Sequence, residues 1–251
     1  MADDRSKQII DYLKQHNLVT VNELVQITGA SAATIRRELV RLDKDGVVYR
    51  VHGGVTLHRF VADQPTTSQK ERVHPDEKAA IAAAAVKLIK PNDAIVLDAG
   101  TTTIQIARGV LHMPLRVITN DLRIGLLLAE YQQIETSLTG GSIDWSSQSC
   151  IGPHATSFLQ TIHPTITFVS CNAFSVQTGI TAPTFDKAYM KRTLLHQSGR
   201  RVLVADSSKY GVTQLFEVGP LADLDVIITD KGLNAAAAEE IRTQGIELIL
   251  C

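Results

Sequence analysis

The sequence predicts an α/β protein of two domains, an N-terminal winged helix-turn-helix and a C-terminal, mostly parallel, doubly wound sheet. Three observations predict this fold class. Apolar residues recur at helical spacing in short segments before residue 46, periodicity is lost between about residues 57 and 75, and beyond that short apolar runs alternate with helical segments. We therefore expect the winged helix-turn-helix at 3–58, a linker at 59–75 and the larger domain at 76–251.

Composition favours a folded protein and excludes several classes. The hydrophobic share of 44% and the charged share of 20% are near globular averages. No apolar run reaches the roughly 18 residues that span a bilayer, and the N-terminus lacks a secretion signal, so we expect a cytoplasmic chain without a membrane partner. Cys150, Cys171 and Cys251 lack the spacing of a metal or redox motif, and we expect neither a metal nor a cofactor.

Three helices are expected in the first domain, from Arg5 to His16, from Val21 to Thr28 and from Ser31 to about Asp45. Thr20 and Ser31 are suitable N-caps for the second and third helices, and Gly29 ends the second. Beyond Gly46, the stretch 47–55 reads as two β segments joined by a turn. This order is typical of a winged helix-turn-helix, whose third helix reads DNA.

The third helix carries arginines on its outward face. Its first turn offers small side chains and hydroxyls that can approach base edges, and Arg36 and Arg37 can reach guanine or phosphate. The alternative is that these arginines form an ordinary solvated face, and Glu38 and Asp43 would repel phosphate nearby. The order of elements favours DNA binding. The candidate contacts are Thr20, Ser31, Ala32, Ala33, Thr34, Arg36, Arg37, Arg41, Arg50 and His52.

Strands and helices alternate in the second domain. Asp76 can cap an Ala-rich helix that runs to about Lys90. Buried strands are expected at 94–97, 115–119, 134–138, 165–169, 201–205, 226–229 and 246–250, with helices at 122–131 and 234–243. This pattern predicts a mostly parallel sheet that is covered on both faces.

The carboxyl ends of these strands are polar, and ligands of such sheets bind at that edge. The most informative loop is Asp98 to Thr103, where a strand, a Gly-Thr-Thr-Thr turn and a helix would point N–H groups and hydroxyls at one spot, as phosphate sites do. The loop is neither a Walker motif nor a dinucleotide fingerprint. Each loop alone could be a simple turn, but six polar loops at one edge favour a ligand site.

The chain resembles the DeoR family of bacterial regulators of sugar metabolism, of the glycerol-3-phosphate repressor type. In the first domain the resemblance lies in the stretches 19–24, 31–39 and 50–54. In the second domain it lies in Asp98 to Thr102, Thr119 to Asp121, Gly140-Gly141, Lys191 and Asp206 to Lys209. The stretch Ser170 to Phe174 departs from the Gly-rich turn of many relatives, which leaves the effector open.

The resemblance implies a fold similar to ribose-5-phosphate isomerases, used as a receptor. It implies a repressor of a carbohydrate-catabolism operon that is controlled by a phosphorylated sugar. Phosphate would lie against Gly100 to Thr103, with Lys191 and Lys209 as cationic partners. The implied ligand-binding residues are Asp98, Gly100, Thr101, Thr102, Thr103, Asn120, Asp121, Gly140, Gly141, Asn172, Lys191, Asp206 and Lys209.

Two other functions are weighed against a regulator. A sugar-phosphate isomerase-like enzyme could use Asp98 or Asp121 as a base beside Lys191, but an isomerase has no use for a basic recognition helix. A DNA-architectural protein would not require a polar-edged sheet. We therefore expect no enzyme, with operator DNA and a small effector as partners. A homo-oligomer, either dimer or tetramer, is expected because one helix-turn-helix reads few base pairs.

Overall fold

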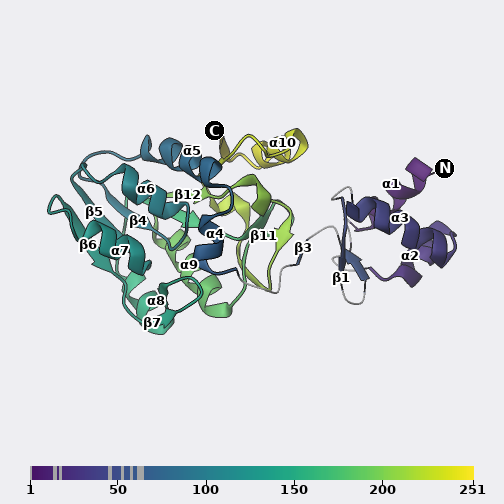
Figure 1. The fold of residues 1–251 in the computed structure, drawn as a ribbon, viewed down its shortest axis with the longest axis horizontal. Helices are drawn as coiled ribbons and strands as arrows, with labels where there is room; N and C mark the ends of the chain where they lie inside the picture. The colour runs from purple at the N-terminus through teal and green to yellow at the C-terminus, as the bar shows by residue number, and fades with distance from the viewer. Residues whose placement is uncertain are drawn as a thin grey trace. The chain divides into compact units, whose positions relative to one another are not determined.

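The computed structural model describes residues 2–13, 16, 19–44, 47–51, 54–56, 59–60 and 65–251. The chain divides into two compact units (Figure 1). The first comprises residues Met1–Val61 with Gly211–Thr213, and the second comprises Ala62–Tyr210 with Gln214–Cys251.

Three helices and a short hairpin make up most of the first unit. The helices are α1 (Ala2–Leu13), α2 (Val21–Thr28) and α3 (Ala32–Lys44), and the antiparallel hairpin is β1 (Tyr49–Val51) with β2 (Gly54–Thr56). Helix α1 begins three residues earlier than the sequence predicts, and residues 14–15 of the predicted helix lie outside the described residues. Strand β3 (Arg59–Phe60) pairs in parallel with β13 (Val212–Thr213).

The core of the first unit joins all three helices to the hairpin. It is formed by Ile9, Leu13, Val19, Leu24, Ile35, Leu39, Leu42, Val48 and Val55. Val19 and Val55 also exchange two backbone hydrogen bonds, of 3.0 and 2.8 Å, so the residue that precedes α2 is joined to the hairpin. The apolar stripe of α3 therefore faces inward, which leaves its arginine face outward.

The second unit is built on a seven-stranded parallel sheet in the order β16-β15-β12-β9-β4-β5-β6. Its strands are β4 (Ala94–Leu97), β5 (Leu115–Thr119), β6 (Ile134–Leu138), β9 (Ile166–Ser170), β12 (Arg200–Val204), β15 (Val226–Thr229) and β16 (Glu247–Leu250). Every pairing between them is parallel. The predicted doubly wound sheet is confirmed, with strand ends within one residue of those expected.

Helices cover both faces of this sheet (Figure 1). One face packs against α5 (Pro75–Val86), α6 (Thr103–Gly109) and α7 (Leu122–Leu128). The other packs against α8 (Pro153–Leu159), α9 (Phe185–Gln197) and α10 (Ala235–Thr243). The chain changes faces after β6 and returns to the sheet as β9 on the far side of β4. The strand order therefore reverses between β4 and β9, and such a reversal opens a crevice at the carboxyl ends of the two strands.

Several smaller elements complete the second unit. A hairpin of β7 (Ser142–Asp144) and β8 (Ser149–Ile151) follows β6, and β10 (Ala173–Ser175), β11 (Gly179–Ala182) and β14 (Phe216–Gly219) form an antiparallel sheet. Single helical turns lie at η1 (Ser207–Lys209) and η2 (Leu221–Asp223). Within the expected linker 59–75, residues Thr67–Glu71 form a helix, α4, which Thr66 and Gln69 cap reciprocally.

None of the helices in the described ranges is long and apolar enough to cross a membrane.

Candidate functional site

The outward face of α3 presents two arginines to solvent. Arg36 and Arg37 are exposed, whereas Ile35 and Leu39 of the same helix are buried. The Ser31 hydroxyl accepts a hydrogen bond from the Thr34 backbone N–H at 3.2 Å, which fixes the first turn of the helix. Arg37 Nε donates to the Ala33 carbonyl at 3.4 Å, which leaves its other N–H groups and the guanidinium of Arg36 available to a phosphate or a base edge.

Arg41 lies on the same helix but has partners inside the unit. Its guanidinium donates to Glu38 Oε1 at 2.9 Å and to Ser6 Oγ at 2.8 Å, and Ser6 also bonds to Glu38. Arg41 thus bridges α1 and α3. A DNA contact by Arg41 would have to use the N–H groups that these hydrogen bonds leave free.

The other predicted DNA contacts differ in position. Thr20 is exposed and caps α2 in a reciprocal capping box with Glu23. Ser31 and Ala33 are exposed at the start of α3, and Ala32 and Thr34 are half-buried. Arg50 lies on β1, and His52 falls outside the described residues.

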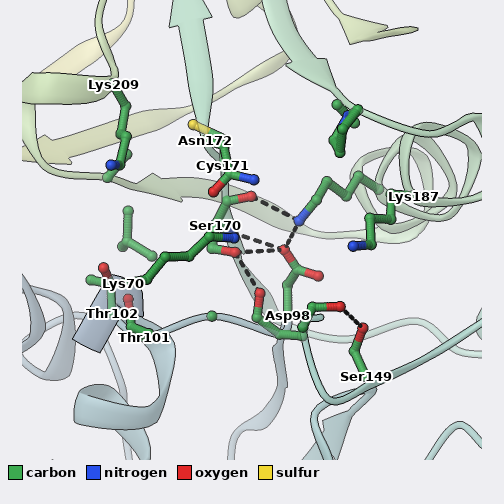
Figure 2. A pocket seen from close by; sticks show the side chains of 18 of the residues that line it. Lys70, Asp98, Thr101, Thr102, Ser149, Ser170, Cys171, Asn172, Lys187 and Lys209 are labelled. Carbon is green, nitrogen blue, oxygen red and sulfur yellow. Dashed lines mark hydrogen bonds and ion pairs between the residues drawn. The ribbon is translucent and has the colours of Figure 1, made fainter. Parts of the chain in front are cut away.

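In the second unit a pocket of about 280 Å³ lies at the carboxyl ends of β4, β9 and β12, where the strand order reverses. Its floor is formed by the loops that begin at Asp98, Ser170 and Ala205. Helix α4 and the start of α9 contribute further walls. This is the position at which doubly wound sheets bind ligands, and Figure 2 shows the side chains that line it.

Asp98 lies at the centre of the pocket in a network of three residues. One of its carboxylate oxygens, Oδ2, accepts from the Ser170 N–H at 3.0 Å, from the Ser170 hydroxyl at 3.2 Å and from Lys191 Nζ (Figure 2). Lys191 also donates to the Ser170 carbonyl at 2.8 Å. The other oxygen, Oδ1, is buried and has no partner among the described residues. A buried acceptor without a partner is costly, so a ligand or water donor there would stabilise the pocket.

The loop after Asp98 is held by the end of β5. The Ala99 N–H donates to Asn120 Oδ1 at 2.8 Å and the Gly100 N–H donates to Asp121 Oδ2 at 3.2 Å. Gly100 also packs closely, because a Cβ there would lie 2.7 Å from Ser170 Oγ. Thr101 and Thr102 line the pocket, and their hydroxyls are the donors that this loop offers to a ligand.

Five lysines and two aspartates line the pocket, and no other acidic or basic side chain does so among the described residues. The lysines are Lys70, Lys78, Lys187, Lys191 and Lys209, and the aspartates are Asp98 and Asp206. Lys187 forms an ion pair with Asp144 at 2.9 Å, and Lys209 lies 3.9 Å from Asp206. The excess of positive charge favours an anionic ligand.

Burial and these charges shift several pKa values. Removal from water, together with repulsion by Lys187, Lys191 and Lys209, lowers the pKa of Lys70 to about 8. Burial likewise lowers the pKa of Lys78 and raises that of Cys171 to about 12. Burial would raise the pKa of Asp144, but its hydrogen bonds from Ser146 and Lys187 hold it well below the usual range. Burial therefore disfavours the charged forms of Lys70, Lys78 and Cys171, whereas Asp144 stays ionised beside Lys187.

The structure brings nine of the thirteen predicted ligand residues to the pocket. They are Asp98, Gly100, Thr101, Thr102, Asn120, Asn172, Lys191, Asp206 and Lys209. The other four are not among its lining residues. Thr103 donates to the Gly100 carbonyl, and Asp121 caps α7 by accepting from the N–H groups of Arg123 and Ile124. Gly140 and Gly141 form the turn between β6 and β7. These four residues shape the loops instead of lining the cavity.

Sequence reasoning missed three of the pocket's lysines. Lys78 could have been found, because it occupies the buried stripe of α5 with Ile81, Ala82 and Ala85 at helical spacing. Lys187 lies one helical turn before Lys191 on α9, which also places it on the same face. No helical pattern marks Lys70, which lies in the segment 59–75 that the sequence predicts to be a linker.

Comparison with known proteins places both units in one family. Residues 5–59 match the DeoR-like helix-turn-helix domain, and residues 73–231 match the DeoR C terminal sensor domain. An uncharacterized HTH-type transcriptional regulator of Haemophilus influenzae is 38% identical over 98% of this chain and 96% of its own length. The HTH-type transcriptional regulator GlpR of Haloferax volcanii is 34% identical, with coverage of 98% and 96%. The HTH-type transcriptional repressor GlcR of Bacillus subtilis is 28% identical, with coverage of 99% and 96%.

Solved structures show a more distant similarity. Ribose 5-phosphate isomerase A of Methanocaldococcus jannaschii matches with a TM-score of 0.40 and 17% identity over 54% of each chain. The enzyme of Neisseria gonorrhoeae matches with a TM-score of 0.40 and 16% identity over 61% of this chain and 57% of its own. Similarity at this level says nothing about activity. The sequence matches, which extend over both units, show that the chain belongs to the DeoR family of helix-turn-helix transcriptional regulators.

Proposed function

We propose that the protein is an operator-binding repressor whose DNA affinity is controlled by a phosphorylated sugar or a related metabolite in the pocket of the second unit. The observation that carries the proposal is the lining of that pocket, where five lysines face only two aspartates. A phosphate ester would bring negative charge to this excess of cations. Relatives named as repressors, among them GlcR, support the sign of regulation.

The ligand-binding residues of this proposal come from loops that meet at the pocket. Thr101, Thr102, Lys191 and Lys209 would hold the phosphate, because all four line the cavity and carry hydroxyl or ammonium donors. Asn172 and Asp206 remain for sugar hydroxyls. A cavity of about 280 Å³ is close to the smallest sites that bind small metabolites, which suits a short sugar phosphate.

Recognition of DNA would rest on α3. Arg36 and Arg37 are exposed cations of this helix, and Ser31 and Ala33 are small enough to let the helix approach base edges. Arg50 and His52 of the wing are proposed as additional contacts. We propose a homo-oligomer acting in the cytoplasm, since two half-sites supply the specificity that one helix lacks. Exposed apolar side chains of the second unit, Trp145 above all at 79% exposure, support association through that unit.

An isomerase reaction is not supported by the arrangement of the carboxylates. Asp98 is engaged by Lys191 and Ser170, and Asp121 accepts from the α7 backbone outside the pocket. Neither carboxylate is placed as a general base beside a free electrophile. We therefore expect the pocket to bind its ligand without turning it over.

The test is operator binding titrated with effector. DNA that binds the full chain is selected from a random pool, and affinity is measured by fluorescence anisotropy with and without each member of a panel of sugar phosphates. We expect at least one of them to weaken binding tenfold or more, and the unphosphorylated sugar to have no effect. A panel in which no member changes the operator affinity would contradict the proposal. If the free sugar changed the operator affinity equally, the phosphate group would have no part in the proposed recognition.

A further inference from the structure

Helix α4 brings a fifth cation into the pocket from the segment that follows the DNA-binding unit in the chain. Only a few residues of the chain separate this helix from Val61, where the N-terminal stretch of the first unit ends. Four residues of this segment, Pro65, Gln69, Lys70 and Val73, line the pocket. In Figure 2, Lys70 lies on the same side of the pocket as Thr101 and Thr102.

Lys70 differs from the other four lysines in its contacts. Lys191, Lys187 and Lys209 each lie beside an aspartate, and Lys78 donates to the carbonyls of Lys70 and Val73. Within the described part of the chain, the ammonium group of Lys70 has no hydrogen bond or ion pair. Among the described residues, Lys70 is therefore the lysine of the pocket that has neither a carboxylate nor a carbonyl partner.

The helix that carries Lys70 is firmly attached to the second unit. The Thr67 N–H and hydroxyl donate to the Ser146 carbonyl at 2.9 and 3.2 Å, and Arg123 of α7 pairs with Glu71. Lys78 of α5 binds the carbonyls at the end of α4. None of these contacts uses the side chain of Lys70, so they hold the helix in place while that side chain remains available to a ligand.

We propose that Lys70 of α4 binds the anionic group of the effector, which makes the segment adjoining the DNA-binding unit a wall of the effector site. This inference rests on the proposed function and adds to it the residue that links the ligand to the inter-unit segment. An anion at Lys70 neutralises a cation on α4 and adds one more tie between α4 and the floor of the pocket. Effector occupancy would then change how firmly the start of the second unit is held.

The charged groups around Lys70 predict that binding of an anion depends on pH. Lys70 faces Lys187 and Lys191 of α9, Lys209 of η1 and Lys78 of α5, with Asp98, Asp206, Asp144 and the Cys171 thiol nearby. With a pKa of about 8, its ammonium form is about half populated at pH 8 in the free protein. An anion binds the charged form and raises this pKa, so binding at pH 8 takes up a proton. The affinity for the anion should fall as pH rises through about 8.

The test uses inorganic phosphate and the full chain. Isothermal titration at pH 8 in two buffers of different ionisation enthalpy gives both the dissociation constant and the protons taken up. We expect the wild type to bind phosphate with uptake of a fraction of a proton. Lys70→Gln should bind at least tenfold more weakly and take up fewer protons than the wild type. Lys70→Arg should bind nearly as well as the wild type, again with less uptake, since a guanidinium keeps its charge at this pH.

A matched control is Lys90→Gln, which removes an exposed lysine that does not line the pocket and should behave as the wild type. Wild-type phosphate affinity in Lys70→Gln, or absence of proton uptake in the wild type, would overturn the assignment. Operator titrations separate it from the proposed function. If a sugar phosphate releases wild-type protein and Lys70→Gln equally from DNA, this inference fails and the proposed function stands. If phosphate binds at Lys70 but no sugar phosphate alters operator affinity, the proposed function fails instead.

Discussion

Lys191 and Asp98 form an ion pair between two elements that are 93 positions apart in the chain, and neither side chain is more than 11% exposed. The pair joins α9 to the end of β4, and the Ser170 carbonyl accepts a further hydrogen bond from the same ammonium group. It therefore contributes both to the stability of the second unit and to the charge of its pocket.

Lys191→Met should lower the free energy of unfolding by about 3 kcal/mol, because it leaves the carboxylate of Asp98 buried without its counter-charge. Urea denaturation monitored by circular dichroism measures the loss. The double variant Asp98→Asn with Lys191→Met should recover part of it, since no unpaired charge remains. A single variant as stable as the wild type would contradict this account of the pair.

Lys209→Met should behave differently, because Lys209 is 27% exposed and 3.9 Å from Asp206. We expect little change in stability, but effector affinity lower by about tenfold to a hundredfold, the usual result of losing a charge-assisted contact. Operator release titrated with the active sugar phosphate measures the effect. An unchanged titration midpoint would remove Lys209 from the phosphate site.

Arg36→Ala with Arg37→Ala should abolish specific operator binding while leaving the thermal midpoint nearly unchanged, because both side chains are exposed. Each lost base or phosphate contact costs about 1–3 kcal/mol of binding free energy. Arg41→Ala is the informative comparison. It removes the bridge to Glu38 and Ser6, so it should lower the thermal midpoint more than it lowers DNA affinity. The reverse pattern would make Arg41 a principal DNA contact.

Gly179→Ala and Gly245→Ala form a matched pair for backbone strain. Both glycines have positive φ, of 65° and 76°, so each substitution incurs a similar backbone cost of about 1–2 kcal/mol. A Cβ at Gly179 would also lie 2.2 Å from the Gly219 carbonyl oxygen, whereas one at Gly245 meets nothing within 4 Å. Gly179→Ala should therefore destabilise the protein far more. Equal losses in urea denaturation would show that β11 and β14 can separate at little cost.

The parallel sheet could be predicted from the sequence because its strands are buried on both faces and read as continuous apolar runs, as 94–97 and 226–229 do. The β7–β8 hairpin gave no such signal, since its strands are three residues long and β7 is largely exposed. In the sheet of β10, β11 and β14, the pairing of β11 with β14 joins residues as far apart as Ile180 and Gly219, which no local pattern encodes.

The candidate site, like the fold, could be predicted only in part. Residues at strand ends, such as Asp98 and Asp206, follow from the rule that parallel strands share a carboxyl edge. Asp121 also follows a strand, but its carboxylate caps α7 and does not line the pocket. The sequence does not show in which direction this side chain points. Lys70 could not be found, because a five-residue helix is too short to show periodicity and is stable only through its packing.

The residues that line the pocket are far apart in the chain, from Pro65 to Gln214, and are therefore synthesised at different times. The three helices of the first unit leave the ribosome early, whereas the pocket also needs residues up to Gln214. Because domains generally fold as units from the N-terminus during synthesis, a nascent chain contains α3 well before its pocket is complete. Translation that stops before η1 would thus leave a polypeptide whose three N-terminal helices are complete but whose pocket lacks Lys209 and Gln214, and which lacks the β13 strand that pairs with β3.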